Sequence, residues 1–150
     1  MNKILTIIIL FLSTTVLNAN ERDAQLDRLF VELKKNISSS SPSIAQKIWI
    51  LWSTHPTNEK LTSILDEGSR LVQDQKLIRA LDIFTDAIEI DPTWAEAWNK
   101  RATVYYMVGE FQKSQDDIDK VLELENRHFG ALAGQGMVNI QLKNYDKAKL

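Results

Sequence analysis

Residues 95–111 read AEAWNKRATVYYMVGEF, and a related pattern lies 34 residues before them and 34 residues after them. When the sequence is shifted by this interval, residues 61–94, 95–128 and 129–150 align as three repeats. The aligned positions carry residues of similar character: Gly68, Ala102 and Gly136; Leu77, Phe111 and Tyr145; Ala80, Ser114 and Ala148. A period of this length is typical of a solenoid, in which each unit packs against its neighbours.

Each repeat is predicted to fold as two amphipathic helices joined by a tight turn. Apolar residues recur three and four positions apart after residue 20, which is the periodicity of a helix with one buried face. The turns are expected near Asp74-Gln75, Val108-Gly109 and Leu142-Lys143. The sequence therefore predicts an all-α fold in which pairs of helices build an α–α superhelix.

The middle repeat resembles the tetratricopeptide repeat family. Residues 95–111 look like the first helix and the turn of that family, and Ser114, Ile118 and Val121 lie at its small, aromatic and small positions in the second helix. The pair Asp91-Pro92 matches the loop that the family usually closes with proline. Small residues at such positions let two helices approach to about 8–10 Å. The likeness covers residues 61–150, and the whole chain is similar to exported repeat proteins of alphaproteobacteria.

Residues 1–19 are predicted to form a cleavable signal peptide. Lys3 gives a short positive region, the run from Ile4 to Leu17 carries no charge, and Ala19 supplies a small residue for cleavage. As a helix this run would span about 21 Å, which is short of the roughly 30 Å of a bilayer core. The expected location is therefore the periplasm or the exterior of the cell, with no membrane span after cleavage.

Residues 20–58 are expected to form a helical hairpin ahead of the repeats. Leu26, Leu29, Phe30 and Leu33 form one stripe of a first helix, and a second helix carries Ile44, Ile48, Leu51 and Trp52 and stops before His55-Pro56. A solenoid needs an element that covers its first apolar face, and this hairpin is the candidate. Trp49 and Trp52 are interpreted as packing groups.

The third repeat, residues 129–150, is incomplete in this sequence. Residues 143–150 begin a second helix, and the corresponding helices of the other repeats continue for about six residues more. We therefore expect the chain to be a fragment of a longer repeat protein, with residues 61–150 as its array.

Composition and motifs argue against several classes of function. The formal net charge is -2, which disfavours binding to nucleic acid or anionic lipid, and 44% apolar with 25% charged residues excludes a disordered chain. The chain has no Cys, and His55 and His128 lie in separate loops. No phosphate-binding loop, nucleophile motif or metal-ligand spacing is present. The prediction is a protein that is not an enzyme and holds no metal or cofactor.

The resemblance implies that the first helices of the repeats line a concave groove that binds protein or peptide segments. The groove positions in this sequence are Asn99, Thr103, Tyr106 and Met107 in the middle repeat, Leu65, Ser69 and Val72 in the first, and Ala133, Met137 and Ile140 in the third. Leu65, Ser69 and Ala133 occupy places where the family's carboxylate-clamping members have Lys or Asn, which disfavours such a clamp. The alternative is that Asn99 and Tyr106 are tolerated surface residues.

Two further residues carry specific predictions. Arg101 lies where the family generally has Leu, with Glu67 and Gln135 at the matching positions of the neighbouring repeats. Because adjacent first helices stack about 10 Å apart, these side chains are expected to form a polar ladder, Glu67–Arg101–Gln135, that fixes register. His128 is expected to make a hydrogen bond in the turn between two repeats, with a pH-sensitive contact as the alternative.

Two hypotheses for the function follow. The first is an exported, non-enzymatic adaptor that binds protein segments in the groove, with envelope assembly or protein folding as the process that it serves by resemblance. The second is a structural or self-associating helical domain of a longer polypeptide.

Overall fold

The computed structural model describes residues 21–35 and 41–144 of the chain. The predicted signal peptide, residues 1–19, and the predicted helix start at residues 145–150 lie outside this part. Every regular element in the described ranges is an α-helix, which confirms the all-α prediction. The chain divides into two compact units, Met1–Thr62 and Ser63–Leu150.

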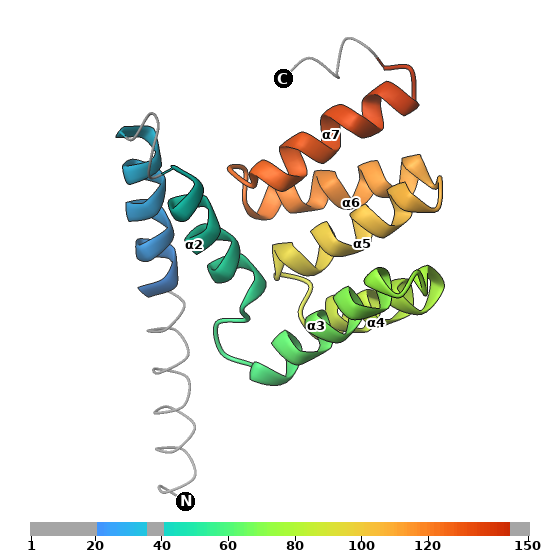
Figure 1. Ribbon diagram of the computed structural model, residues 1–150, viewed down its shortest axis with the longest axis horizontal. Helices are drawn as coiled ribbons and strands as arrows, with labels where there is room; N and C mark the ends of the chain where they lie inside the picture. The colour runs from blue at the N-terminus through green and yellow to red at the C-terminus, as the bar shows by residue number, and fades with distance from the viewer. Residues whose placement is uncertain (1–20, 36–40, 145–150) are drawn as a thin grey trace, which may run out of the picture. The chain divides into compact units, whose positions relative to one another are not determined.

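The first unit contains two helices, residues 21–35 and α2 (Ser41–Ser53), which lie side by side (Figure 1). They pack through buried aliphatic and aromatic side chains: Leu26, Leu29, Ile44, Ile48 and Trp52. The ring of Phe30 lies 6.0 Å from that of Trp52, and Trp49 meets Trp52 edge-on at 5.5 Å. The two tryptophans are therefore packing groups, as predicted, and α2 ends ahead of His55-Pro56. That this hairpin caps the array stays a prediction.

The other helices are α3 (Glu59–Gln73), α4 (Leu77–Ile90), α5 (Ala95–Met107), α6 (Phe111–Leu124) and α7 (Phe129–Gln141). In Figure 1 they succeed one another from α3 and α4, through α5 and α6, to α7. Helix α5 packs against α4, α6 and α7, so it is the central element of this unit. The turns predicted near Asp74-Gln75, Val108-Gly109 and Leu142-Lys143 lie at the ends of α3, α5 and α7. The repeat boundaries themselves stay a prediction.

Small residues let the two helices of a repeat come close together. A Cβ atom at Gly68 would clash with the ring of Phe84, lying 2.8 Å from its Cζ atom, so only glycine fits there. In the next repeat Ala102 takes the same position, and its carbonyl accepts a hydrogen bond of 2.8 Å from Ser114 Oγ of α6. The small positions that the repeat pattern identified are thus the places where helices α3 and α5 meet their partners.

The 34-residue period is visible in the backbone of the turns. Gln75, Gly109 and Lys143 follow α3, α5 and α7, and all three have positive φ angles, 60°, 82° and 59°. At each turn the residue with positive φ and the residue after it donate backbone hydrogen bonds to the end of the preceding helix. After α3, Gln75 donates to Val72 (3.0 Å) and Lys76 to Leu71 (2.8 Å). After α5, Gly109 donates to Tyr106 (3.1 Å) and Glu110 to Tyr105 (2.9 Å). After α7, Lys143 donates to Ile140 (3.1 Å) and Asn144 to Asn139 (2.8 Å). Such pairs satisfy carbonyls that a helix end otherwise leaves without partners.

The three turns allow a stability test, because only the middle one has glycine. Replacing Gly109 with Ala should lower the free energy of unfolding by about 1 kcal/mol, since a residue with a Cβ atom is strained at positive φ. The added methyl group would meet nothing within 4 Å, so strain is the only cost. Replacing Gln75 with Gly should raise the same quantity by about 0.5 kcal/mol. Denaturant unfolding followed by circular dichroism measures both; an unchanged midpoint for Gly109→Ala would contradict the strain argument.

Candidate functional site

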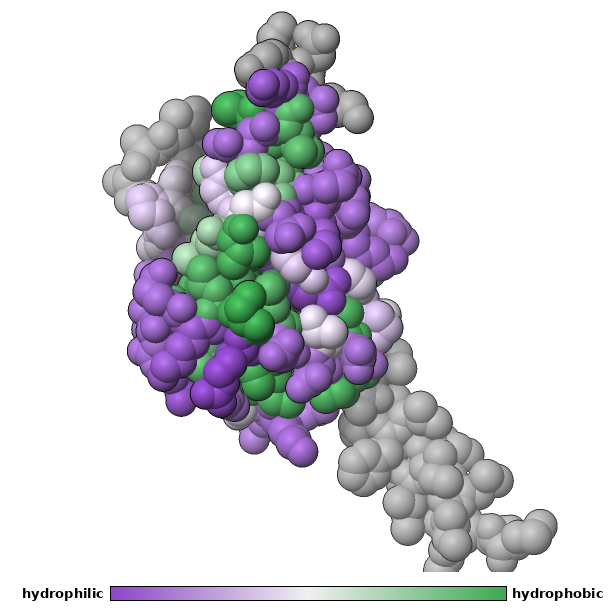
Figure 2. Space-filling model, turned by 90° about the vertical axis from the view of Figure 1, so that its right-hand side faces the viewer, coloured by the Kyte–Doolittle hydropathy of each residue, from purple (hydrophilic) through white to green (hydrophobic). Residues whose placement is uncertain are grey.

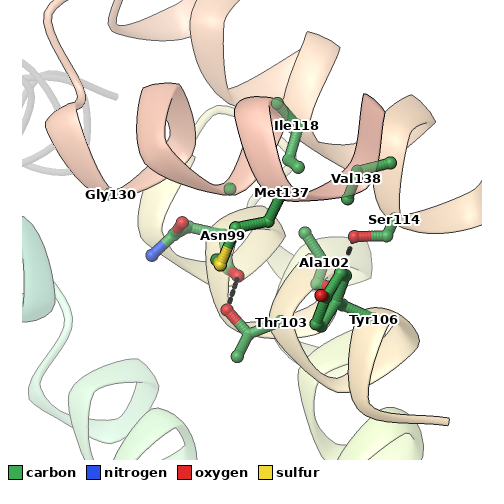
Figure 3. Close-up of a pocket in the computed structure, with 10 residues that line it drawn as sticks. Asn99, Ala102, Thr103, Tyr106, Ser114, Ile118, Gly130, Met137 and Val138 are labelled. Atoms are coloured by element: carbon green, nitrogen blue, oxygen red, sulfur yellow. Dashed lines mark hydrogen bonds between the residues drawn. The ribbon is translucent and has the colours of Figure 1, made fainter. Parts of the chain in front are cut away.

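A small pocket lies where α5, α6 and α7 meet, with a cavity volume of about 70 Å³. Its lining comes from all three helices: Asn99, Ala102, Thr103, Tyr106, Ser114, Ile118, Gly130, Gly134, Met137 and Val138. Figure 3 shows Met137 of α7 facing Asn99 and Thr103 of α5 across this pocket, with Ser114 of α6 beside Ala102. The site is therefore formed between consecutive first helices, α5 and α7, over a floor supplied by α6.

Four of the predicted groove residues come together here: Asn99, Thr103, Tyr106 and Met137 all line the pocket. The other six lie outside its lining: Leu65, Ser69, Val72, Met107, Ala133 and Ile140. The prediction for Leu65 is wrong, because its side chain is only 1% exposed and belongs to the core. The side chain of Met107 is exposed, and Ser69 is half-buried with its Oγ donating 2.9 Å to the carbonyl of Leu65 in its own helix. Whether any of these residues contacts a partner stays a prediction.

Sequence reasoning missed the α6 and α7 residues that complete the pocket. Gly130 and Gly134 lie four positions apart on α7 and both line the cavity, while Ile118 contributes an apolar wall from α6. The signal was present in the sequence, because residues four apart lie on one face of a helix. It could be interpreted only once the facing helix was known.

The polar groups near the pocket are held by bonds within the protein. Thr103 Oγ1 donates 2.9 Å to the carbonyl of Asn99, and Asn99 Nδ2 donates 3.1 Å to Glu96 Oε2. Tyr106 Oη receives only a long contact of 3.5 Å from Gln141 Nε2. Asn99 is 8% exposed, so its amide has a fixed orientation rather than a solvated, mobile one.

A buried pair, Glu96 and His128, fixes the start of α7 relative to α5. His128 is the N-cap of α7: its Nδ1 accepts a hydrogen bond of 3.1 Å from the backbone N–H of Ala131. Its Nε2 lies 2.9 Å from Glu96 Oε2, and both side chains are fully buried. Because Nδ1 is an acceptor, the proton of the neutral ring sits on Nε2 and is donated to Glu96. The predicted turn hydrogen bond of His128 is confirmed, and its second bond joins two repeats.

The carboxylate of Glu96 is also favourably placed in the electrostatic field of α5. It lies in the first turn of the helix, where partial positive charge stabilises an anion. Its other oxygen lies 3.3 Å from Lys100 Nζ, one turn further along. Asn99 and His128 both bond to Oε2, whereas Oε1 has the Lys100 charge nearby but no hydrogen bond, so the charge of this buried carboxylate is only partly compensated.

Uncharged side chains dominate this face. Helix α7 reads FGALAGQGMVNIQ and contains no acidic or basic residue. Met107, Met137 and Ile140 are 42%, 50% and 53% exposed, which is high for side chains of this size. On the side of the molecule drawn in Figure 2, hydrophobic surface likewise forms a green area bordered by purple polar side chains. The arrangement suits apolar contacts rather than the binding of a charged group.

The predicted ladder Glu67–Arg101–Gln135 is wrong. Arg101 Nε and Nη2 donate 2.8 Å each to the two carboxylate oxygens of Asp117, and Nη1 donates 3.2 Å to Thr85 Oγ1. In the described part of the chain Arg101 makes no bond to Glu67, which is exposed, or to Gln135. The physical reason is direction: Arg101 points from α5 toward the second helices α4 and α6, not along the row of first helices.

Arg101 is held from several sides. Its guanidinium carbon lies 5.0 Å from the centre of the Trp98 ring and 5.6 Å from that of Tyr105. The hydrogen bond to Asp117 raises the pKa of Arg101, against the opposing effect of burial. Burial raises the pKa of Asp117 although the bond from Arg101 opposes this. The pair thus carries a desolvation cost that its bidentate bond offsets.

The described residues offer neither a metal site nor a membrane span. No group of three or more His, Asp or Glu side chains there is arranged to hold a metal ion. None of the helices in residues 21–35 and 41–144 combines the length and the hydrophobicity that a transmembrane span requires.

The known proteins that are similar to this chain in sequence include tetratricopeptide repeat proteins and Hsp70-Hsp90 organizing proteins. A TPR repeat-containing protein of Rhizobium etli is 34% identical over 123 residues, which are 81% of this chain and 60% of that protein. Hsp70-Hsp90 organizing protein 1 of Glycine max is 31% identical over 83 residues, which are 55% of this chain and 14% of that protein. The chain therefore spans 60% or less of the length of these relatives. No family model matches the chain.

A solved structure supports the fold. The crystal structure of a tetratricopeptide repeat protein from Parabacteroides merdae matches with a TM-score of 0.55 and 17% identity, covering 88% of this chain and 58% of that one. At this identity the likeness concerns the fold alone. The Rhizobium etli relative agrees with the resemblance to alphaproteobacterial repeat proteins.

The Arg101–Asp117 pair provides a second stability test. Arg101→Met should lower the free energy of unfolding by about 3 kcal/mol, because it leaves the buried Asp117 carboxylate without its counter-ion. Combining it with Asp117→Leu should bring the protein back to within about 1 kcal/mol of the original, since an apolar pair has no desolvation cost.

Urea unfolding of both single variants and the double variant measures this coupling. Lys120→Met is the control, because Lys120 and Glu123 form an exposed pair on α6 and its loss should change stability by no more than about 0.5 kcal/mol. If Arg101→Met costs no more than the control, the bidentate pair does not stabilise the fold in the way described.

Proposed function

The protein belongs to the tetratricopeptide repeat family, and we propose that it is an exported adaptor that binds segments of other proteins along the face formed by α3, α5 and α7. A role in protein–protein interaction is the function that the fold and the relatives support in general. Binding along this particular face, and export, are the parts that belong to the proposal.

The observation that carries the proposal is the pocket between α5 and α7. It is lined by four residues from positions where the family resemblance places ligand contacts: Asn99, Thr103, Tyr106 and Met137. Exposed apolar side chains continue this face beyond the pocket at Met107 and Ile140. Exposed apolar surface next to a pocket marks interaction sites more often than inert surface.

Non-enzymatic binding fits the chemistry of the site. The pocket lining contains no His, Asp, Glu, Lys or Arg, so the hydroxyls of Thr103, Tyr106 and Ser114 have no base in the lining that would activate them as nucleophiles. The relatives carry names that describe repeats or the organisation of other proteins rather than a reaction. Tetratricopeptide repeat proteins are generally scaffolds, which supports the same reading.

Site-specific photo-crosslinking tests the binding face. A benzoylphenylalanine at Thr103, at the pocket, should crosslink partner proteins in living cells, whereas the same group at Glu123, on the exposed side of α6, should not. Adding Tyr106→Ala and Asn99→Ala should abolish the crosslinks at Thr103 without unfolding the protein. Equal crosslinking at both positions would remove this face from the proposal, and crosslinks only to a second copy of the chain would favour the self-associating alternative.

Export rests on residues 1–19 and is tested separately. An alkaline phosphatase reporter fused after residue 25 should be active outside the cytoplasm, and deletion of residues 1–19 should abolish that activity. A fusion that is equally active without residues 1–19 would contradict a signal peptide.

A further inference from the structure

The pocket between α5 and α7 is open because two residues of α7 have no side chain. Gly130 and Gly134 both line it. One repeat earlier the same positions carry Glu96 and Lys100, whose charged side chains pair with each other at 3.3 Å.

Its volume sets the size of an occupant. An apolar cavity of about 150 Å³ takes benzene, which has six carbons. The cavity here has a volume of about 70 Å³, about half of that, so it has room for about three carbon atoms. Three carbons are the branched end of a leucine or valine side chain, and that group matches the walls supplied by Ala102, Ile118 and Val138.

The charges around the pocket exclude ionic groups. No lining residue is charged, and α7 carries no charge along its whole length. The carboxylate that bonds to the lining residue Asn99, that of Glu96, already accepts a bond from His128 as well. A lysine, an acidic side chain or a terminal carboxylate would lose its hydration in this pocket and gain no counter-ion, at a high cost in free energy.

One polar atom at the pocket is suited to a peptide backbone. Asn99 is 92% buried, since only 8% of it is exposed, and its Nδ2 is committed to Glu96. Its Oδ1 accepts no hydrogen bond from any residue of the described chain. This oxygen is not among the buried side-chain atoms that lack a partner, so a backbone N–H of a bound segment would replace solvent as its hydrogen-bond donor.

The orientation of this amide is imposed from α7. His128 caps α7 with Nδ1 and donates from Nε2 to Glu96, and Glu96 in turn accepts from Asn99. If the amide were flipped, two oxygens would face each other at about 3 Å, which is repulsive. Glu96 is thus a positioning residue that turns Asn99 Oδ1 toward the place where a ligand would lie.

We propose that this pocket selects an internal segment of a partner protein that inserts one leucine or valine side chain between Gly130 and Gly134 and donates its backbone N–H to Asn99. This inference deepens the proposed function and rests on it, because it names the chemistry that the binding face recognises. The aliphatic group provides the selectivity, and the amide fixes the direction of the chain.

Blocked amino acids test the pocket without knowledge of the partner. N-acetyl-leucine N-methylamide offers both the side chain and the N–H, and it should shift the ¹⁵N-amide resonances of residues 99, 103 and 137 in a saturable way. The alanine compound should bind roughly fiftyfold more weakly, because it lacks three buried carbons, and the lysine and glutamate compounds should bind no better than alanine.

Two variants separate the two contacts. Gly134→Ala places a methyl group 3.3 Å from Ile118 Cδ1, inside the cavity, and should reduce the preference for leucine over alanine to about one. Alanine in a helix is also more stable than glycine, so this variant should fold. Asn99→Ala should weaken all compounds by a similar factor. Glu123→Gln, on the exposed side of α6 and outside the lining, is the control and should change nothing.

The outcomes distinguish this inference from the proposed function. Equal binding of leucine and alanine compounds, or a leucine preference that survives Gly134→Ala, would overturn the pocket assignment. If the crosslinks at Thr103 persist in that case, the adaptor proposal stands and only its selectivity is wrong.

Discussion

The close approach of paired helices is the constraint on which the second unit depends. At Gly68 the ring of Phe84 leaves no room for a Cβ atom, and at Ala102 the carbonyl of one helix bonds to Ser114 of the next. Helices at this separation bury their apolar stripes completely, as in Phe84 and Val121, which have no exposed surface. The turns recur every 34 residues, and the backbone has a positive φ angle at the same position of each turn. Successive helix pairs therefore stack in a repeated arrangement.

The candidate site arises where individual residues depart from that regular pattern. Arg101, in place of an apolar residue, joins α5 to α4 and α6 at once through Thr85 and Asp117. Glu96 and His128 form a buried polar pair between α5 and the start of α7. Gly130 and Gly134 remove the side chains that would otherwise fill the space beside α5. The repeat supplies the scaffold, and these few substitutions supply the chemistry.

The sequence was sufficient for the repeat, the helices and the turns, because these depend on local periodicity and on residues a fixed distance apart. Asn99, Thr103 and Tyr106 could be placed on one helix face for the same reason. The partner of Arg101 could not be found this way, since its choice between Glu67 and Asp117 depends on where the side chain points between three helices. The pocket could not be predicted from the sequence either, because it depends on two glycines of α7 lying opposite particular residues of α5 and α6.

The bond between Glu96 and His128 has a consequence for how such a protein grows. Both residues lie within one repeat, residues 95–128, and His128 caps whichever helix comes next through its ring nitrogen and a backbone N–H. A gene segment that encodes residues 95–128 therefore encodes both side chains of this bond. Tandem duplication of that segment would reproduce the bond at every new boundary, whereas the segment encoding residues 61–94, with Thr62 and Trp94 at the matching positions, has no such pair to copy.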